Sequence, residues 1–192
     1  MRKLFMYNMV SVDGFFAGED GNIDWHVADN EFDDFAVAYN TKVHNVDTVL
    51  FGRTTYELFA SYWPVSLKDP KTSPAERELA QIIENLEKHV FSSSLEKVSW
   101  NKSVLHKDLD QTFIKELKAK EGGDIVIWGS GTICSQLAKA NLIDEYAFMI
   151  NPVILGKGRS LFPEMTQYMQ LDLISSKAYK SGNILVTYHP SK

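Results

Sequence analysis

The sequence has little cysteine and no long apolar segment. Cys134 is the one cysteine in 192 residues, so the chain cannot form an internal disulfide. No apolar run approaches the roughly 18 residues that a membrane helix needs, and Asn8 interrupts the short apolar stretch after Met1, unlike a secretory signal peptide. We therefore expect a cytoplasmic protein with no membrane partner. The net charge of -5 also argues against nucleic acid as its main partner.

Common catalytic motifs are missing as well. The sequence has no Gly-x-Ser-x-Gly, His-Glu-x-x-His or Cys-x-x-Cys motif. The histidines show no metal-ligand spacing, so we predict no metal site; they are His26, His44, His89, His106 and His189. Cys134 follows a glycine turn, where a helix N-terminus would favour its thiolate. Nothing else supports nucleophilic catalysis, so we interpret Cys134 as structural.

The hydrophobic pattern that is present predicts one α/β domain over residues 1–192. Apolar runs typical of buried strands alternate with helical spacing, and three strands then close the chain. The expected strands are residues 3–10, 48–51, 88–91, 103–106, 124–128, 145–155, 171–179 and 184–189. The expected helices are residues 30–43, 55–63, 74–86, 111–121 and 132–141, with Thr54 or Thr55 capping the second and Ser73 the third. This order predicts a mainly parallel sheet with an antiparallel C-terminal edge.

A strand, a glycine turn and a helix follow one another at residues 124–141. The apolar strand ends in Gly129-Ser130-Gly131, and Thr132 and Ile133 open the helix. This geometry directs backbone N–H groups and a helix N-terminus at one point, which suits a phosphate group. Because the third glycine of the dinucleotide-binding fingerprint would fall at Cys134, the turn alone does not identify a nucleotide site.

Three strand ends carry residues suited to phosphate. Besides the glycine turn, Gly52-Arg53-Thr54 and Ser92-Ser93-Ser94 each follow an expected strand. Ligands of open parallel sheets bind beyond the carboxyl ends of the strands, and a guanidinium with nearby hydroxyl groups matches phosphate. Together the three strand ends predict a ligand with several phosphates, such as a dinucleotide.

A long loop and a group of carboxylates mark a second region of interest. Residues 14–25 contain three glycines among acidic residues, and long loops of this kind are often functional. Glu31 and Phe35 would share one face of the following helix, where an apolar neighbour could raise the pKa of Glu31 and make it a proton donor. A solvated acidic first turn is the alternative, and it is favoured for Asp29 and Asp33.

These features together resemble the dihydrofolate reductase superfamily. The chain is most similar to the C-terminal reductase domain of the bifunctional riboflavin-biosynthesis deaminase-reductase. The resemblance rests on Ser11-Val12-Asp13-Gly14, Gly52-Arg53-Thr54-Thr55, Ser92-Ser93, Gly129-Ser130-Gly131 and residues 152–162, PVILGKGRSLF, in this order along nearly the whole chain. It implies a three-layer dihydrofolate-reductase-like fold.

The resemblance also implies NADPH as the cofactor. The implied cofactor-binding residues are Met9, Gly52, Arg53, Thr54, Thr55, Ser92, Ser93, Gly129, Ser130, Gly131, Thr132 and Ile133. Met9 would lie at the nicotinamide carboxamide. Arg53, Thr54, Ser92 and Ser93 would hold the pyrophosphate and the 2′-phosphate. The implied substrate-binding residues are Asp13, Trp25, Phe35 and Trp128. Glu31 would be the catalytic acid, with Asp29 as the alternative.

The sequence departs from the riboflavin-type reductases at the substrate side. Trp128 occupies the position at which these reductases usually carry a glutamate that binds the substrate, and no zinc deaminase motif is present. We therefore predict an NADPH-dependent reductase that transfers hydride to a C=N or C=O group of a small heterocycle, resembling 5-amino-6-(5-phosphoribosylamino)uracil reductase. A dihydrofolate reductase and a nucleotide-binding protein without catalysis are the alternatives. The apolar late strands predict a homodimer.

Overall fold

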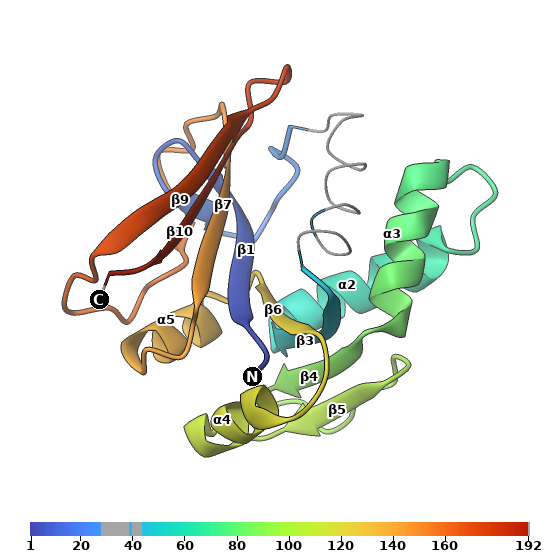
Figure 1. Ribbon diagram of the computed structural model, residues 1–192. Coiled ribbons are helices and arrows are strands. Elements are labelled where there is room, and N and C mark those ends of the chain that lie inside the picture. The colour runs from blue at the N-terminus through green and yellow to red at the C-terminus, as the bar shows by residue number, and fades with distance from the viewer. Residues whose placement is uncertain (28–38, 40–43, 192) are drawn as a thin grey trace. The chain divides into compact units, whose positions relative to one another are not determined.

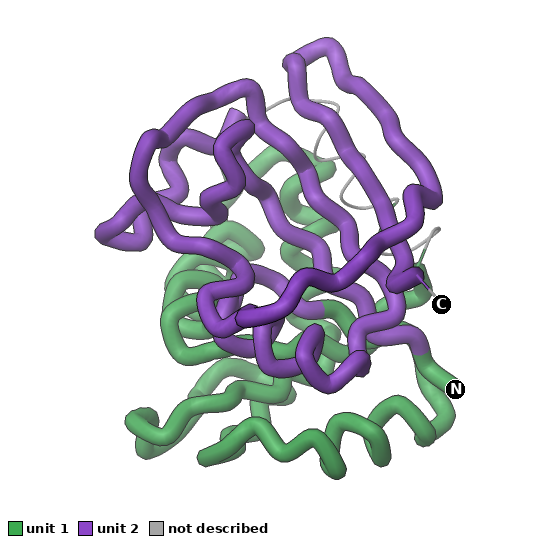
Figure 2. Tube along the Cα trace, turned by 90° about the vertical axis from the view of Figure 1, so that its left-hand side faces the viewer, with its two compact units in different colours: residues 1–2, 29–126 green, residues 3–28, 127–192 purple. Residues whose placement is uncertain are grey.

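The computed structural model describes residues 1–27, 39 and 44–191 (Figure 1). The chain divides into two compact units, unit 1 with residues 1–2 and 29–126 and unit 2 with residues 3–28 and 127–192 (Figure 2). We describe each unit separately. In the described residues, no helix is long and apolar enough to cross a membrane.

Parallel strands form the sheet of unit 1. Strand β4 (Glu87–Phe91) lies between β3 (Val46–Gly52) and β5 (Ser103–His106) and pairs in parallel with both. The start of β6 (Asp124–Trp128) follows β3 in the strand order. These strands form because each carries an apolar run, and residues 49–51 and 125–126 are fully buried.

The described residues of unit 1 contain three helices, namely α2 (Arg53–Ser66), α3 (Pro74–Asn85) and α4 (Gln111–Ala119). In Figure 1, α2 and α3 lie on one side of β4 and β5, and α4 lies on the other side. The side chains agree, because Phe59 of α2 packs on Phe51 of β3, whereas Phe113 of α4 packs on His89 and Phe91 of β4. Unit 1 is therefore a sheet covered on both faces.

The helix starts of unit 1 confirm one expected cap and correct another. Ser73 caps α3 as expected, and its Oγ accepts a hydrogen bond from the Glu76 amide at 3.1 Å. Helix α2 instead begins at Arg53, with Gly52 at its cap position and no side-chain cap, so the expectation of Thr54 or Thr55 was wrong. The helix also continues past Pro64 to Ser66, since a proline in the last turn costs few backbone hydrogen bonds.

Unit 2 combines parallel and antiparallel pairing. Strand β1 (Leu4–Ser11) pairs in parallel with β7 (Glu145–Asn151), which pairs antiparallel with β10 (Ile184–Pro190), which pairs antiparallel with β9 (Leu171–Ala178). The end of β6 lies beside β1 in the strand order and leads into α5 (Gly131–Lys139). The fold class is therefore confirmed as α/β, with a mostly parallel sheet and an antiparallel C-terminal edge.

Two details of unit 2 differ from the expectation. The loop at residues 14–25 contains the short strand β2 (Phe15–Ala17), which pairs with β8 (Arg159–Ser160). Strand β7 ends at Asn151 rather than at residue 155, because Pro152 has no N–H with which to continue the ladder. The following Ile154 is 76% exposed and does not contribute to the core.

Candidate functional site

Two of the phosphate-suited strand ends meet at one edge of unit 1. In the parallel register of β3 and β4, Gly52 pairs with Phe91. Arg53 and Ser92 directly follow these two residues, so the carboxyl ends of the strands place them beside each other. The structure therefore brings together Gly52-Arg53-Thr54 and Ser92-Ser93-Ser94, two of the three strand ends that the sequence analysis assigned to phosphate.

Arg53 also opens helix α2. Its guanidinium is about half exposed, and Nη1 donates a hydrogen bond to Glu57 Oε2 at 3.0 Å. The first turn of α2 contains no acidic residue and has no side-chain cap, while Thr54 is exposed at its surface. The positive end of the helix dipole and the guanidinium thus act at the same point, which favours an anion.

The serines after β4 have different environments. Ser92 is buried, and its Oγ accepts hydrogen bonds from the amides of Leu95 at 3.0 Å and Ser94 at 3.3 Å. Ser92 therefore holds the shape of this turn. Ser93 is exposed, so its hydroxyl group is the one presented at the surface.

The glycine turn of unit 2 consists of two consecutive left-handed residues. Gly129 has φ 58° and Ser130 has φ 61°. The Gly129 amide donates to Asn8 Oδ1 at 2.6 Å, and Ser130 Oγ donates to the Trp128 carbonyl at 3.2 Å. Helix α5 then begins at Gly131 with no side-chain cap, and Thr132 is exposed in its first turn. This is a helix N-terminus with the backbone geometry that the sequence predicted.

Gly131 has a packing role that the sequence did not indicate. It opens α5, and its φ is not positive. A Cβ at this position would lie 2.6 Å from the Ser160 carbonyl oxygen. Gly131 is therefore required because the chain itself, at the end of β8, passes close to the turn.

Asn8 is a site residue that the sequence analysis missed. It is buried on β1, and besides accepting from Gly129 it places Nδ2 3.9 Å from Cys134 Sγ. The sequence feature that could have identified Asn8 is a polar amide within an otherwise apolar strand.

Cys134 is fully buried behind the same turn. Burial raises the pKa of Cys134 to about 12, and Sγ donates to the Gly129 carbonyl at 3.5 Å. Cys134 is thus a structural residue that supports the turn, as the sequence indicated.

Asp13 connects the start of the 14–25 loop to the segment after β7. Its carboxylate accepts hydrogen bonds from Ser11 Oγ at 2.6 Å, the Leu155 amide at 3.1 Å and the Gly156 amide at 2.7 Å. The bond from Ser11 is the main reason that the pKa of Asp13 is lowered. Both carboxylate oxygens therefore bind the protein, and the structure gives Asp13 a positioning role at this loop.

The end of the same loop is held by two asparagines that the sequence analysis also missed. The Val27 amide donates to Asn151 Oδ1 at 2.9 Å, and Asn183 Nδ2 donates to the Val27 carbonyl at 3.2 Å. Asn183 Oδ1 and His26 Nε2 are buried without a hydrogen-bond partner in the described part of the chain, and burial lowers the pKa of His26 to about 4. Asn151 lies in the expected strand 145–155 and Asn183 lies between the last two expected strands, so neither position indicated a contact with Val27.

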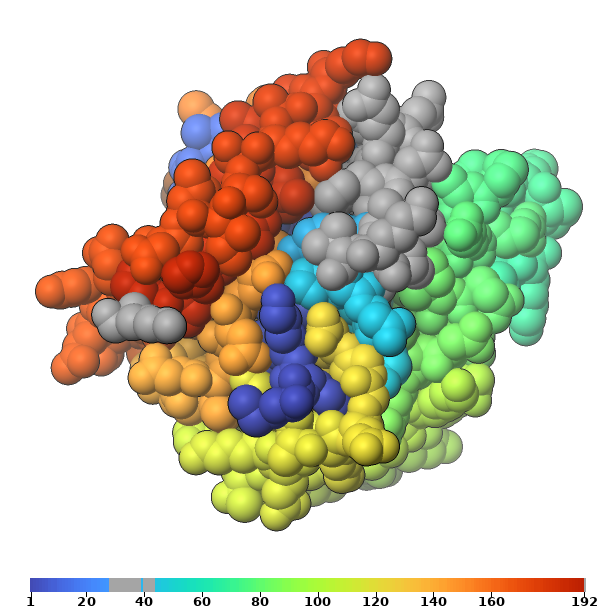
Figure 3. Space-filling view, viewed as in Figure 1, coloured from blue at the N-terminus to red at the C-terminus, as the bar shows by residue number. Residues whose placement is uncertain are grey.

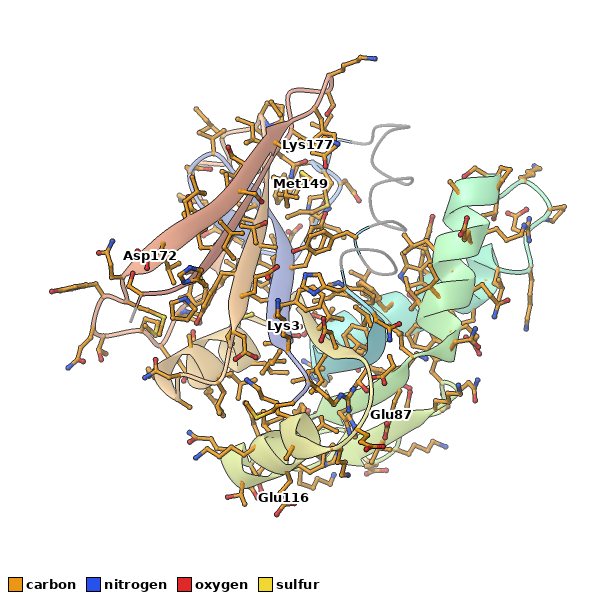
Figure 4. All side chains as sticks on the ribbon, in the orientation of Figure 1. Lys3, Glu87, Glu116, Met149, Asp172 and Lys177 are labelled. Carbon is orange, nitrogen blue, oxygen red and sulfur yellow. The ribbon has the colours of Figure 1, made fainter. Side chains whose placement is uncertain are left out.

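Two of the aromatic candidates, Trp25 and Trp128, lie in unit 2. Trp25 Nε1 donates to the Asn22 carbonyl at 3.2 Å, and its ring packs edge-on against His26. Trp128 is the last residue of β6 and is buried. Met9 on β1 pairs with Met149 on β7, which Figure 4 labels. Three further candidates, Asp29, Glu31 and Phe35, lie outside the described residues.

Comparisons with known proteins identify the family. The family model of the RibD C-terminal domain matches residues 2–185. The uncharacterized protein YyaP of Bacillus subtilis (strain 168) is 30% identical over 190 residues, covering 98% of this chain and 95% of the relative. A putative riboflavin biosynthesis protein from Shewanella sp. PV-4 has a similar structure, with a TM-score of 0.70 at 22% identity over 99% of both chains.

A structure of dihydrofolate reductase from Enterococcus faecalis, complexed with NADP(H) and RAB-propyl, shares the fold. It has a TM-score of 0.63 at 16% identity, covering 99% of this chain and 97% of the reductase. The match to the family model spans almost all 192 residues. This chain therefore belongs to the RibD C-terminal domain family.

Proposed function

We propose that this protein is a reductase that uses NADPH to reduce a C=N or C=O group of a small heterocyclic substrate, with chemistry resembling that of 5-amino-6-(5-phosphoribosylamino)uracil reductase. The proposal is supported by its family and by the dihydrofolate-reductase-like fold. The observation that carries it is the register of β3 and β4, which places Arg53, the N-terminus of α2 and the serine turn at one edge.

The residues present in unit 1 fit the 2′-phosphate end of the cofactor. A dianionic phosphate needs positive charge and hydrogen-bond donors, and Arg53, Thr54 and the exposed Ser93 supply both without an acidic residue in the first turn of α2. Glu57 is a competing anion, and its exposed pair with Arg53 contributes only about 0.3–0.5 kcal/mol. A phosphate can therefore replace Glu57 as the partner of Arg53.

Unit 2 would hold the pyrophosphate and the nicotinamide. The amides that open α5 at Gly131, Thr132 and Ile133 face no side-chain cap, which is the arrangement that an anion at a helix N-terminus requires. The bond from Gly129 to Asn8 keeps the turn in its left-handed form. Met9 near the end of β1 would lie at the nicotinamide, as the resemblance implies.

The cofactor would supply the hydride, so the protein must orient the substrate, exclude water and provide a proton. We assign the proton to Glu31, with Asp29 as the alternative donor. Trp25, Phe35 and Trp128 would form an apolar substrate site. Since Trp128 replaces a glutamate of the riboflavin-type reductases, we expect a substrate without the group that this glutamate binds.

The test combines cofactor binding with turnover. NADPH at about a hundred times its dissociation constant should stabilise the protein by about 2.7 kcal/mol, measured as a thermal shift. Loss of NADPH absorbance is then followed with a panel of dihydropterins and riboflavin precursors. Oxidation of NADPH in the presence of one class of heterocycle supports the proposed reductase. A preference for dihydrofolate supports the dihydrofolate reductase alternative.

Two outcomes would contradict the proposal in different ways. No thermal shift with millimolar NADPH would refute the cofactor assignment. A clear shift without NADPH oxidation by any member of the panel would support a nucleotide-binding protein without catalysis. The matched control is Lys115→Ala, which removes an exposed charge from α4 at a position that is not a candidate residue.

A further inference from the structure

Ser130 holds a backbone conformation that residues with a side chain rarely adopt. It has φ 61° and ψ 60°, in the left-handed region. In that region the Cβ of an L-residue lies too close to the following carbonyl oxygen, which lowers the population of the conformation by roughly tenfold. The neighbouring Gly129 has φ 58° without this cost, because it has no Cβ. The turn therefore needs support from other parts of the chain at Ser130.

Asn8 on β1 makes a contact that depends on this form of the turn. Its side chain is buried, and Oδ1 accepts a hydrogen bond from the Gly129 amide at 2.6 Å. Its Nδ2 lies 3.9 Å from Cys134 Sγ, which in turn donates to the Gly129 carbonyl at 3.5 Å. If the turn changed its conformation, the Gly129 amide would rotate away and leave the buried Oδ1 without this donor, which is unfavourable. Asn8 thus opposes the conformational cost at Ser130.

The bond between Asn8 and Gly129 joins the two parts of unit 2 that the proposed cofactor site requires. Strands β1 and β6 are neighbours in the sheet (Figure 1). Asn8 directly precedes Met9, which the resemblance places at the nicotinamide, and Gly129 directly precedes the turn at the start of α5. A change at Asn8 would therefore alter the position of the turn relative to the end of β1.

We propose that Asn8 is a positioning residue for NADPH, which holds Ser130 in the left-handed form that the pyrophosphate site requires. The inference rests on the proposed function, because it concerns the same cofactor site. The apparent affinity for a ligand falls in proportion to the fraction of molecules in the form that binds it. A turn that leaves this form in about nine molecules of ten would bind NADPH about tenfold more weakly.

The first test compares NADPH with 2′-AMP in calorimetric titrations of Asn8→Ala. The variant should bind NADPH about tenfold or more weakly. It should bind 2′-AMP as the wild type does, because 2′-AMP carries the 2′-phosphate but no pyrophosphate and no nicotinamide. Arg53→Ala should weaken both ligands. Asn8→Ser leaves a smaller space in β1 and has the same expected result, so it replaces Asn8→Ala if that variant does not fold.

The second test is a rescue by Ser130→Gly. A glycine has no Cβ, so the left-handed form no longer needs the support of Asn8. The double variant Asn8→Ala/Ser130→Gly should therefore bind NADPH within about threefold of Ser130→Gly alone. A direct contact between Asn8 and NADPH, or a general loss of stability in Asn8→Ala, would not be corrected by this change.

The third test observes the turn in the protein without cofactor. A strong nuclear Overhauser effect between the amide and α protons of one residue marks a positive φ. The wild type should show this effect at Ser130, and Asn8→Ala should lose most of it. This measurement depends on the turn alone and requires no ligand.

Two control variants separate this effect from a loss of stability. Ser135 is buried in α5, where its Oγ donates to the Leu161 carbonyl at 3.5 Å and accepts from the Glu164 amide at 3.3 Å. Ser135→Ala therefore removes buried hydrogen bonds from the same helix without changing a contact of the turn. Lys115→Ala changes α4, which lies at the surface in Figure 3. Both variants should bind NADPH as the wild type does.

Three results would overturn the inference and leave the proposed function in place. They are normal NADPH affinity in the folded Asn8 variants, a loss that Ser130→Gly does not rescue, and a positive φ at Ser130 that persists in these variants. A wild type that does not bind NADPH would refute the proposed function together with this inference. Weaker NADPH binding with unchanged 2′-AMP binding, rescue by glycine and a changed turn would support Asn8 as the positioning residue.

Discussion

The assignment of Arg53 to the 2′-phosphate predicts a cofactor-specific effect of Arg53→Ala. NADPH carries this phosphate and NADH does not, so the variant should weaken NADPH binding and leave NADH binding nearly unchanged. Arg53 is suited to this test because its guanidinium is half exposed and pairs with the equally exposed Glu57, so its removal should not unfold α2. Glu57→Gln is the complementary change, since it removes the anion that now holds Arg53.

The size of the effect follows from the exposure of the site. Hydrogen bonds to charged groups contribute roughly 1.5–3 kcal/mol each, and partial exposure with salt screening reduces this figure. The competing pair with Glu57 contributes about 0.3–0.5 kcal/mol. A net loss of about 1.4 kcal/mol is tenfold in affinity. We therefore expect Arg53→Ala to weaken NADPH binding by about tenfold or more, and Glu57→Gln to strengthen it by about twofold.

Parallel calorimetric titrations of the wild type and the variants with NADPH and NADH measure this difference. The preference for NADPH should also decrease as salt concentration rises. Lys115→Ala controls for the loss of one surface charge in unit 1. An equal loss of affinity for NADPH and NADH in Arg53→Ala would place Arg53 at the pyrophosphate. A wild type that binds NADH more tightly than NADPH would refute the 2′-phosphate assignment.

Three further predictions concern the proton donor, the glycine turn and a buried histidine. Glu31→Gln should lower turnover by about 10²–10⁴-fold with little change in NADPH affinity, and steady-state kinetics with unchanged turnover would exclude Glu31 as the donor. Gly131→Ala should destabilise the protein by about 1–3 kcal/mol, because the new methyl group meets the Ser160 carbonyl; urea unfolding measures this, with the exposed Thr132→Ala as the control. Burial lowers the pKa of His89 from 6.5 to about 4, so its neutral form stabilises the fold fully above pH 6.5 and this stabilisation is lost as the pH falls toward about 4. His89→Phe should flatten the pH dependence of stability in that interval, and an unchanged slope would show that other groups cause it.

Local sequence signals were sufficient for the longer elements and for their class, whereas the short strands β2 and β8 were not predicted. The apolar run of β1 and the helical spacing and Ser73 cap of α3 lie in consecutive residues, so the sequence alone predicts them. The same holds for the hairpin between β9 and β10, whose Gly182 has the positive φ that a tight turn needs. The order of these elements then indicated the α/β class. The roles of Asp29, Glu31 and the cofactor-binding residues stay predictions.

The long-range contacts at the candidate site could be seen only in the tertiary structure. Asn8 and Gly129 are 121 residues apart, and Val27 and Asn183 are 156 residues apart, so no local pattern links them. The packing role of Gly131 could not be predicted, because the position of Ser160 is unknown until the chain folds back upon itself. Hydrophobic periodicity and helix-capping patterns depend only on residues a few positions apart in the sequence. The residues that hydrogen-bond to a turn depend instead on which strands lie side by side. The sequence alone therefore determined most of the elements, and the tertiary structure decided which side chains position the turn and the loop.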